Sequence, residues 1–295
     1  MKTTNPLTSR GFALDMSLDS FGELRRSSDV LGDTEELRRR RLEDGYLYLP
    51  GFFPRDDVAA ARNEFVSRLR DLNALDPDYP VEQAIAAKNL PPNIARAVVR
   101  ENAPLRDVVF STRLLKFYEK LLGSDVRHYD HIWTRVVAPG EGTAPHCDLV
   151  YMGRGTHDVM TAWIPYGDVS LDLGGLMLLE KSHTQTERLR KYLASDVDTY
   201  CENRGPYKHK SGLLSSNPAS LREKMGGRWL TAEFRMGDLL TFGMKLVHAS
   251  LDNQTRAFRM SSDSRYQLAS EPIDERWVGS DTEEYSERNR IGKIC

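Results

Sequence analysis

The segment APHCDL, residues 144–149, places a histidine and an aspartate two positions apart, directly behind a run that contains proline and glycine. Apolar residues follow the pair, so the two polar side chains need a chemical or structural reason to lie there. On an extended segment alternate side chains share a face, which would put His146 and Asp148 on one face and Cys147 on the other. Such a pair could hold one metal ion. Alone, however, the pattern fits a hydrogen-bonded pair at a strand end better.

A third metal ligand must come from elsewhere in the chain, and His248 is the candidate. It follows the strand-like run Asp238–Phe242 and lies 100 residues beyond Asp148, so only the fold can unite the two. Two imidazoles and one carboxylate on one face of a metal leave the opposite face open, which suits non-haem Fe(II). The same three ligands could also hold zinc in a hydrolase.

Arg259 lies 11 residues after His248 and is a candidate for binding an anion. A turn around Asp252–Asn253 would return the next strand beside His248, and Arg259 and Ser261 would then share a face of that strand. A guanidinium with a neighbouring hydroxyl is a good receiver for a carboxylate. In isolation Arg259 fits an exposed strand arginine, but its apolar neighbours at 258 and 260 and the His-x-Asp pair upstream favour anion binding.

The residue pattern in the second half of the chain is typical of a β-sandwich or barrel. Short runs rich in β-branched, aromatic and aliphatic residues alternate with turn residues such as Gly174-Gly175, a spacing typical of antiparallel sheets. No internal repeat is visible. The expected strands are Val126–Val137, Val159–Tyr166, Leu176–Leu179, Trp229–Phe234, Asp238–Phe242 and Arg259–Leu268.

Helical patterns precede these strands. A short charged helix is expected over Glu35–Arg41, with Asp33 as its N-terminal cap. Apolar residues at helical spacing predict two amphipathic helices, one from Arg55 to about Leu72 and one over Leu105–Leu122. Helices first and a β core second is the architecture that the pattern indicates.

The expected domain organisation follows from these changes in pattern. Residues 1–33 are expected to form an N-terminal arm, and residues 34–295 a single domain. Within it we expect a helical part at about 34–123, a β core at about 124–270, and a polar, partly basic insert at about 182–227. The insert is expected to be either a solvated face or a lid over the substrate.

Composition excludes several classes of function. Lys and Arg number 41 against 43 Asp and Glu, so the basic footprint of a nucleic-acid-binding protein is missing. No apolar run approaches the roughly 18 residues of a membrane span, and the N-terminus lacks the apolar core of a secretory signal. Three widely separated cysteines form neither a disulfide framework nor zinc-finger spacing, which favours a cytoplasmic location.

Taken in order, these motifs resemble the phytanoyl-CoA dioxygenase (PhyH-like) family of Fe(II)/2-oxoglutarate-dependent oxygenases. The resemblance spans roughly residues 35–268. Two turns depart from the family pattern: Gly174-Gly175 replaces an Asn-Gly, and Glu180–His183 replaces a Pro-Gly-Ser-His. The matching segments are Glu43–Phe53, His146–Tyr151, Val159–Ile164, Leu173–His183, Gly237-Asp238, His248 and Arg259–Ser261.

The resemblance implies a mainly β fold with flanking helices around a double-stranded β-helix, the jelly roll of cupin-like proteins. It implies Fe(II) as the metal, 2-oxoglutarate as co-substrate, and O₂ and a small molecule as the other reactants. It also implies roles for particular residues. These are His146, Asp148 and His248 as catalytic metal ligands, Arg259 with Ser261 at the distal carboxylate of 2-oxoglutarate, and Thr161, Trp163 and Trp133 around the co-substrate.

The expected activity is therefore hydroxylation, with decarboxylation of 2-oxoglutarate to succinate and CO₂. Halogenating relatives replace the carboxylate ligand with a small residue, so the presence of Asp148 favours hydroxylation over halogenation. Desaturation stays open. So do a non-catalytic jelly-roll protein that binds a metal or ligand, and the zinc hydrolase named above. No motif selects the substrate or the oligomeric state.

Overall fold

Two antiparallel β-sheets face each other across an apolar interior, in the computed structural model that describes residues 6–279 except 92–93, 95–97, 99–101 and 200–207. Strands of the large sheet run in the order β4-β12-β7-β14-β5, with β6 also paired to β14. The bounds are β4 Tyr46–Leu49, β12 Leu239–Gly243, β7 Met160–Pro165, β14 Arg259–Leu268, β5 Val126–His128 and β6 Trp133–Val137.

The small sheet has the order β13-β8-β11-β3, and only its β11–β3 pair is parallel. Side chains from both sheets meet between them: Trp163 and Leu240 from the large sheet pack with Leu178 and Leu230 from the small one. The expected double-stranded β-helix is thereby confirmed. The bounds of the small sheet are β13 His248–Ser250, β8 Leu176–Leu179, β11 Trp229–Thr231 and β3 Phe21–Glu23.

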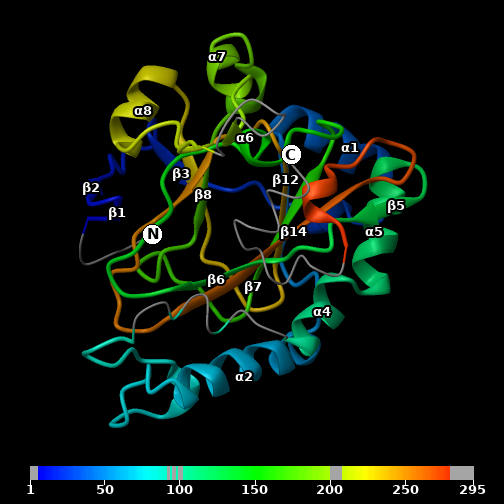
Figure 1. The fold of residues 1–295 in the computed structure, drawn as a ribbon. Helices are drawn as coiled ribbons and strands as arrows, with labels where there is room; N and C mark the ends of the chain where they lie inside the picture. Colours follow the sequence, from blue (N-terminus) through cyan, green and yellow to red (C-terminus); the bar gives the residue numbers. More distant parts are fainter. Residues whose placement is uncertain (1–5, 92–93, 95–97, 99–101, 200–207, 280–295) are drawn as a thin grey trace.

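Helices cover the outer face of the large sheet, as the blue and teal ribbons of Figure 1 show. The single helix expected over 105–122 is two, because Ser111 caps a new helix by accepting a hydrogen bond from the backbone N–H of Leu114. Asp33 caps the first helix as expected, accepting from the N–H of Glu36. The bounds are α1 Thr34–Asp44, α2 Arg55–Asp71, α4 Ala103–Val109 and α5 Thr112–Leu122.

Two strand expectations need correction. The run 126–137 is two strands, β5 and β6, because the chain leaves the sheet edge between them. The run 229–234 is paired as a strand only over its first three residues, after which Phe234 forms an isolated bridge with Val169.

The N-terminal segment is part of the β core rather than an arm beside it. Its residues 6–33 form a small hairpin, β1 Thr8–Ser9 with β2 Phe12–Ala13, and then add β3 to the small sheet. Leu7 and Phe21 are buried against that sheet. The sequence misses this because the partners lie some 200 residues away and the strands are too short to show a periodic pattern.

The insert at about 182–227 lies over one end of the β core (Figure 1). Backbone hydrogen bonds tie it to the segment that carries the His-x-Asp pair, from Val197 to Val150 and from Leu214 to Pro145. Arg276, almost fully buried, fixes it further through ion pairs to Asp196 and Asp198. The insert contains η3 Ser182–Thr184, α7 Arg190–Leu193, β9 Asp198–Thr199, β10 Lys208–His209 and α8 Pro218–Met225; beyond it lies η4 Glu275–Trp277.

Among the residues that the structure describes, none of the helices has both the length and the apolar character that crossing a membrane would require.

The turn at Gly174 provides a test of the fold. Its φ is +88°, and a Cβ there would lie 2.7 Å from the carbonyl oxygen of Leu251. Gly140 has a similar φ of +83° but open space around it. We expect Gly140→Ala to lower the free energy of unfolding by about 1–2 kcal/mol through φ strain alone, and Gly174→Ala by about 1–3 kcal/mol more. Urea unfolding measures both, and equal losses would contradict the close packing at Gly174.

Candidate metal centre

The two histidines meet through the backbone. The N–H of each of His146 and His248 donates to the carbonyl oxygen of the other, both at 3.0 Å, which joins the segment before α6 (Leu149–Met152) to strand β13. The imidazole rings are 4.1 Å apart, and both side chains are buried. A single antiparallel bridge thus brings together two residues that the sequence separates by about a hundred positions.

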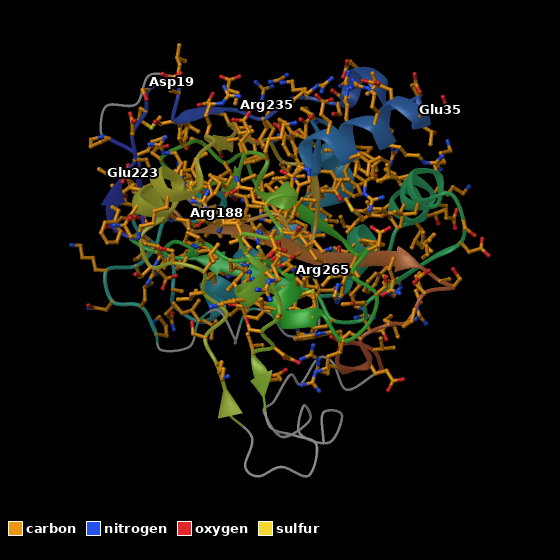
Figure 2. All side chains as sticks on the ribbon, turned by 90° about the horizontal axis from the view of Figure 1, so that it is seen from above. Asp19, Glu35, Arg188, Glu223, Arg235 and Arg265 are labelled. Carbon is orange, nitrogen blue, oxygen red and sulfur yellow. The ribbon has the colours of Figure 1, made fainter. Side chains whose placement is uncertain are left out.

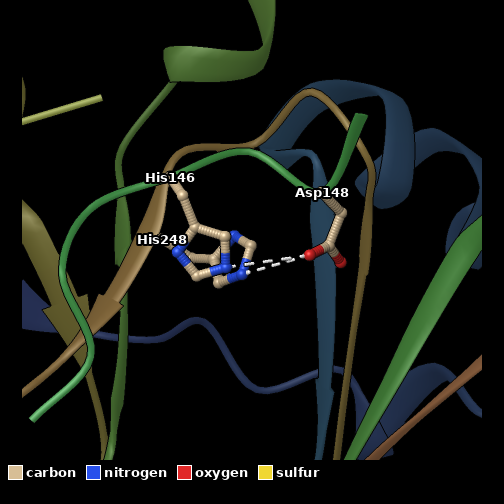
Figure 3. Close-up of side chains that lie close together, drawn as sticks. All are labelled: His146, Asp148 and His248. Carbon is tan, nitrogen blue, oxygen red and sulfur yellow. Dashed lines mark ion pairs between the residues drawn. The ribbon is translucent and has the colours of Figure 1, made fainter. Parts of the chain in front are cut away.

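Asp148 completes the group, though not in the way the sequence suggested. Its backbone is helical, with φ −63° and ψ −28°, at the start of the short helix α6, so the pair does not lie on an extended segment. The turn nevertheless directs the carboxylate toward the imidazoles (Figure 3). Its Oδ1 lies 3.8 Å from Nε2 of His146 and 3.6 Å from Nε2 of His248.

Cys147 points away from this group, as expected. It is fully buried in the apolar layer on the far side of the small sheet, and its Sγ contacts the carbonyl oxygen of Lys245. Burial raises the pKa of the Cys147 thiol. Because only a thiolate is an effective nucleophile, Cys147 is a packing residue. The other two cysteines, Cys201 and Cys295, lie outside the described residues.

The imidazoles are prepared to act as ligands. Nδ1 of His146 lies 2.9 Å from the carbonyl oxygen of Ala144, and Nδ1 of His248 lies 3.1 Å from that of Leu246. Since a carbonyl oxygen can only accept, both Nδ1 atoms carry a proton, which leaves Nε2 of each ring, on the side of Asp148, as the atom that can bind a metal. Burial, together with the neighbouring His248, lowers the pKa of His146 to about 3, so the ring is neutral, as a metal requires.

The carboxylate of Asp148 is held from the large sheet. Burial alone would raise the pKa of this carboxyl, but Arg265, the two histidines and the hydroxyl of Thr161 together lower it below its usual value. Thr161 donates to Oδ2 at 2.6 Å, and Arg265 donates to the same oxygen at 3.0 Å. Both bonds fall on Oδ2, which leaves Oδ1 free toward the imidazoles.

These residues fit a divalent metal. One donor atom from each of the three residues lies within 4.8 Å of the other two, and all three residues are buried. The set of two imidazoles and one carboxylate is the facial triad that suits non-haem iron. The second nitrogen of each ring has its own partner, which is the usual support for a metal-binding histidine.

Arg259 lies on the inner face of β14, buried and short of partners. Its Nη1 donates to Ser261 Oγ at 2.9 Å, but its Nε has no hydrogen-bond partner. Burial lowers the pKa of Arg259 to about 10, so the group stays charged at neutral pH. A buried guanidinium with an unsatisfied donor indicates a site for an anion.

The three remaining expected residues differ in their surroundings. Thr161 contacts Asp148 directly. Trp133 lies under the guanidinium of Arg265, whose Cζ is 4.4 Å from the ring centroid. Trp163 instead packs in the core between the sheets, 4.7 Å from the ring of Phe234, and does not line the cavity beside the metal ligands.

A cavity of about 250 Å³ is lined in part by His146 and Asp148. Several of its residues were missed at the sequence level, among them Arg135, Tyr151, Arg265 and Trp277. A signal was available for Arg265, because residues 259, 261, 263 and 265 share one face of a strand. The lining is Trp133, Arg135, Thr143, His146, Asp148, Tyr151, Met152, Val197, Leu213, Arg265 and Trp277.

Arg265, which holds Asp148, marks the position of this site in Figure 2. Seen from above, Arg265 projects from β14 near the middle of the molecule, whereas Asp19, Glu35 and Glu223 lie at its edge. The relative exposure of Arg265 is 2%. The metal ligands therefore lie inside the barrel, away from bulk water.

Two relatives among curated proteins carry the same name, 1-deoxypentalenic acid 11-beta-hydroxylase. The one from Streptomyces exfoliatus is 26% identical over 262 residues, which cover 85% of this chain and 87% of the relative. The one from Streptomyces arenae is 25% identical, with the same coverage.

Solved structures share the fold. The carbocyclase SnoK from nogalamycin biosynthesis, described as non-heme and alpha ketoglutarate dependent, has a TM-score of 0.54 and 18% identity, and the match covers 84% of this chain and 88% of SnoK. The epimerase SnoN, in complex with Fe3+, alpha ketoglutarate and nogalamycin RO, has a TM-score of 0.53 and 21% identity, with 82% and 86% covered.

The sequence pattern of the family described as Phytanoyl-CoA dioxygenase (PhyH) matches residues 42–261, which is most of the chain. Together with the jelly-roll fold and the buried group of two histidines and one aspartate, this match confirms the expected kinship. The chain belongs to the phytanoyl-CoA dioxygenase family and is an enzyme of the non-haem iron, 2-oxoglutarate-dependent class.

Proposed function

We propose that the protein hydroxylates a small molecule in a reaction that consumes O₂ and converts 2-oxoglutarate to succinate and CO₂. The observation that carries this proposal is the buried pairing of an open facial triad with a charged, partly unsatisfied arginine, Arg259, in one barrel. Relatives named as hydroxylases, at 26% and 25% identity over most of the chain, support hydroxylation as the outcome.

In the proposed assignment His146, Asp148 and His248 hold Fe(II). Arg259 and Ser261 receive the distal carboxylate of 2-oxoglutarate, because they are the donors that face the barrel on one strand. The chemistry that the bound metal and co-substrate supply is activation of O₂, coupled to oxidative decarboxylation of 2-oxoglutarate. The protein's own contribution is to bind, orient and exclude water.

Thr161 and Arg265 have a positioning role in this proposal. Both hold Oδ2 of Asp148, so the carboxylate presents Oδ1 to the metal and cannot rotate. Trp133 is proposed to border the co-substrate from the cavity side. Trp163 is proposed to support the same region from the core, where it packs on Phe234.

Alternatives make different demands on these residues. A halogenase needs a vacant position for a halide, but Asp148 supplies a buried carboxylate at that position. A zinc hydrolase has no need of an unsatisfied arginine inside the barrel. A non-catalytic binding protein could use such an arginine, but it would form no succinate. Desaturation uses the same ligands and stays open.

The division of residues 34–295 into a helical part (34–123), a β core (124–270) and an insert (182–227) that serves as a lid stays a proposal. So does a cytoplasmic location.

Removing one metal ligand tests the proposed centre. We expect Asp148→Ala to abolish succinate formation and to lower iron occupancy, because the metal loses its only anionic ligand and Arg265 loses its partner. We expect the same loss of succinate formation and of iron occupancy for His146→Ala. Iron content and succinate release are measured together, with the exposed Asp107→Ala as the control. Succinate release retained in either ligand variant would mean that the ligands are misassigned.

The role of Arg259 is tested by the affinity for 2-oxoglutarate. We expect Arg259→Ala to weaken binding by about 2–5 kcal/mol, since a buried carboxylate would lose its charged partner. Anaerobic titration calorimetry on the iron-loaded protein measures it. The control is Arg256→Ala, three positions earlier, where the arginine is exposed and pairs with Asp76. If the affinity of Arg259→Ala equals that of the control, Arg259 does not bind the co-substrate.

A further inference from the structure

The charged groups inside the barrel do not balance. Three arginines, Arg135, Arg259 and Arg265, face two carboxylates. Arg265 is paired with Asp148 at 3.0 Å and Arg135 with Asp263 at 3.2 Å, whereas Arg259 has no acidic partner. With both histidines neutral as metal ligands, these groups sum to one positive charge.

Binding of the proposed metal and co-substrate would leave this excess unchanged. Fe(II) adds two positive charges and 2-oxoglutarate two negative ones. Asp196, Asp198 and Asp274 lie nearby with Arg154 and Arg276 and together carry one negative charge, but none of these side chains lines the cavity and they are hydrogen-bonded to one another. An excess positive charge in a partly buried site favours a substrate with one negative charge.

Arg135 is the group placed to receive that charge. It lines the cavity from β6, and its side chain is 40% exposed, so it stands at the open end rather than in the depth of the barrel. Only its Nε is engaged, with Asp263, which leaves the outer edge of the guanidinium available. Arg259 with Ser261 lies deeper and suffices for the distal carboxylate of 2-oxoglutarate.

Apart from Thr143, Arg265 and the residues assigned to the metal, the rest of the cavity wall is apolar or aromatic. The two indoles, Trp133 and Trp277, are 4.6 Å apart, and Met152, Val197 and Leu213 contribute aliphatic surface. A volume of about 250 Å³ suits a compact body, below the range usual for drug-sized ligands. The wall thus offers burial to a hydrocarbon body and, on one side, a cation to an anionic group.

Two other substrate classes fit less well. An amino acid carries an ammonium group, but the carboxylates at hand, Asp148 and Asp263, are already paired with arginines. The acyl part of a coenzyme A thioester is neutral where it would enter the cavity, which would leave the outer edge of Arg135 without an anion.

We infer that the substrate is a compact, apolar monocarboxylic acid, bound with its carboxylate on Arg135 and its hydrocarbon body between Trp133, Trp277 and the insert residues Val197 and Leu213. This inference rests on the proposed function, because it assumes that the metal and the co-substrate occupy the inner part of the barrel.

The test uses three probes of one shape and different charge: adamantane-1-carboxylate, adamantane-1-carboxamide and adamantan-1-amine in its ammonium form. They are titrated calorimetrically into the anaerobic protein loaded with Fe(II) and 2-oxoglutarate. We expect the carboxylate to bind at least about 10-fold more tightly than the amide, since hydrogen bonds between charged groups are stronger than those between neutral groups. The ammonium probe should bind most weakly.

Arg135→Met should remove the preference for the carboxylate and leave the affinity for the amide unchanged, while Arg135→Lys should retain part of the preference. The matched control is Arg113→Met, which replaces an exposed arginine on α5 and should leave the preference for the carboxylate unchanged. The affinity for 2-oxoglutarate should be unchanged in Arg135→Met. If Arg135→Met instead loses affinity for 2-oxoglutarate, Arg135 binds the co-substrate and the inference is overturned.

Equal binding of carboxylate and amide by the unaltered protein, or binding of none of the three probes, would also overturn it. These outcomes are distinct from failure of the proposed function, which would appear first as an inability to bind Fe(II) and 2-oxoglutarate.

Discussion

The buried carboxylate of Asp148 is the constraint on which the site depends. A charge in this position is costly unless it is paired and hydrogen-bonded. Its hydrogen-bond donors come from the large sheet, Thr161 on β7 and Arg265 on β14, while His248 on β13 of the small sheet faces the other carboxylate oxygen at 3.6 Å. A metal ion held by Asp148 and the two histidines would therefore link the two layers, and the register of β13 and β14 decides whether that link can form.

This arrangement gives up stability that an apolar core would offer. Arg259 and Arg265 together leave three buried guanidinium N–H groups without a partner, at Nε of both and Nη1 of Arg265. Each unsatisfied donor costs about 1–3 kcal/mol. Binding an anion would recover part of that free energy, so the barrel interior is arranged for its ligands rather than for the empty state. Departures from apolar packing of this kind are expected at functional sites.

The sequence predicts the fold, because turn-separated apolar runs mark the strands. It also predicts that His146, Asp148 and His248 meet, and the structure brings them together. It fails where the cause is not local. The role of Arg135 has no local pattern, because only the closed barrel shows that its face of β6 is inward; Arg265 could have been found, since it shares a strand face with Arg259. The N-terminal strand β3 is missed because its pairing with β11 spans most of the chain.

Different elements build the inner and the outer parts of the site. Residues that select the substrate can therefore differ from residues that hold the metal. The inner part includes strand residues whose spacing is fixed by sheet hydrogen bonds, among them Trp133 and Arg265. The outer wall is supplied in part by Val197 and Leu213 of the insert and by Trp277 near the end of the described chain. Arg276 binds these segments to one another through Asp196, Asp198 and Asp274. Since none of these contacts involves a metal ligand, a substitution in the outer wall can change which molecule fits while leaving the geometry of the metal centre intact.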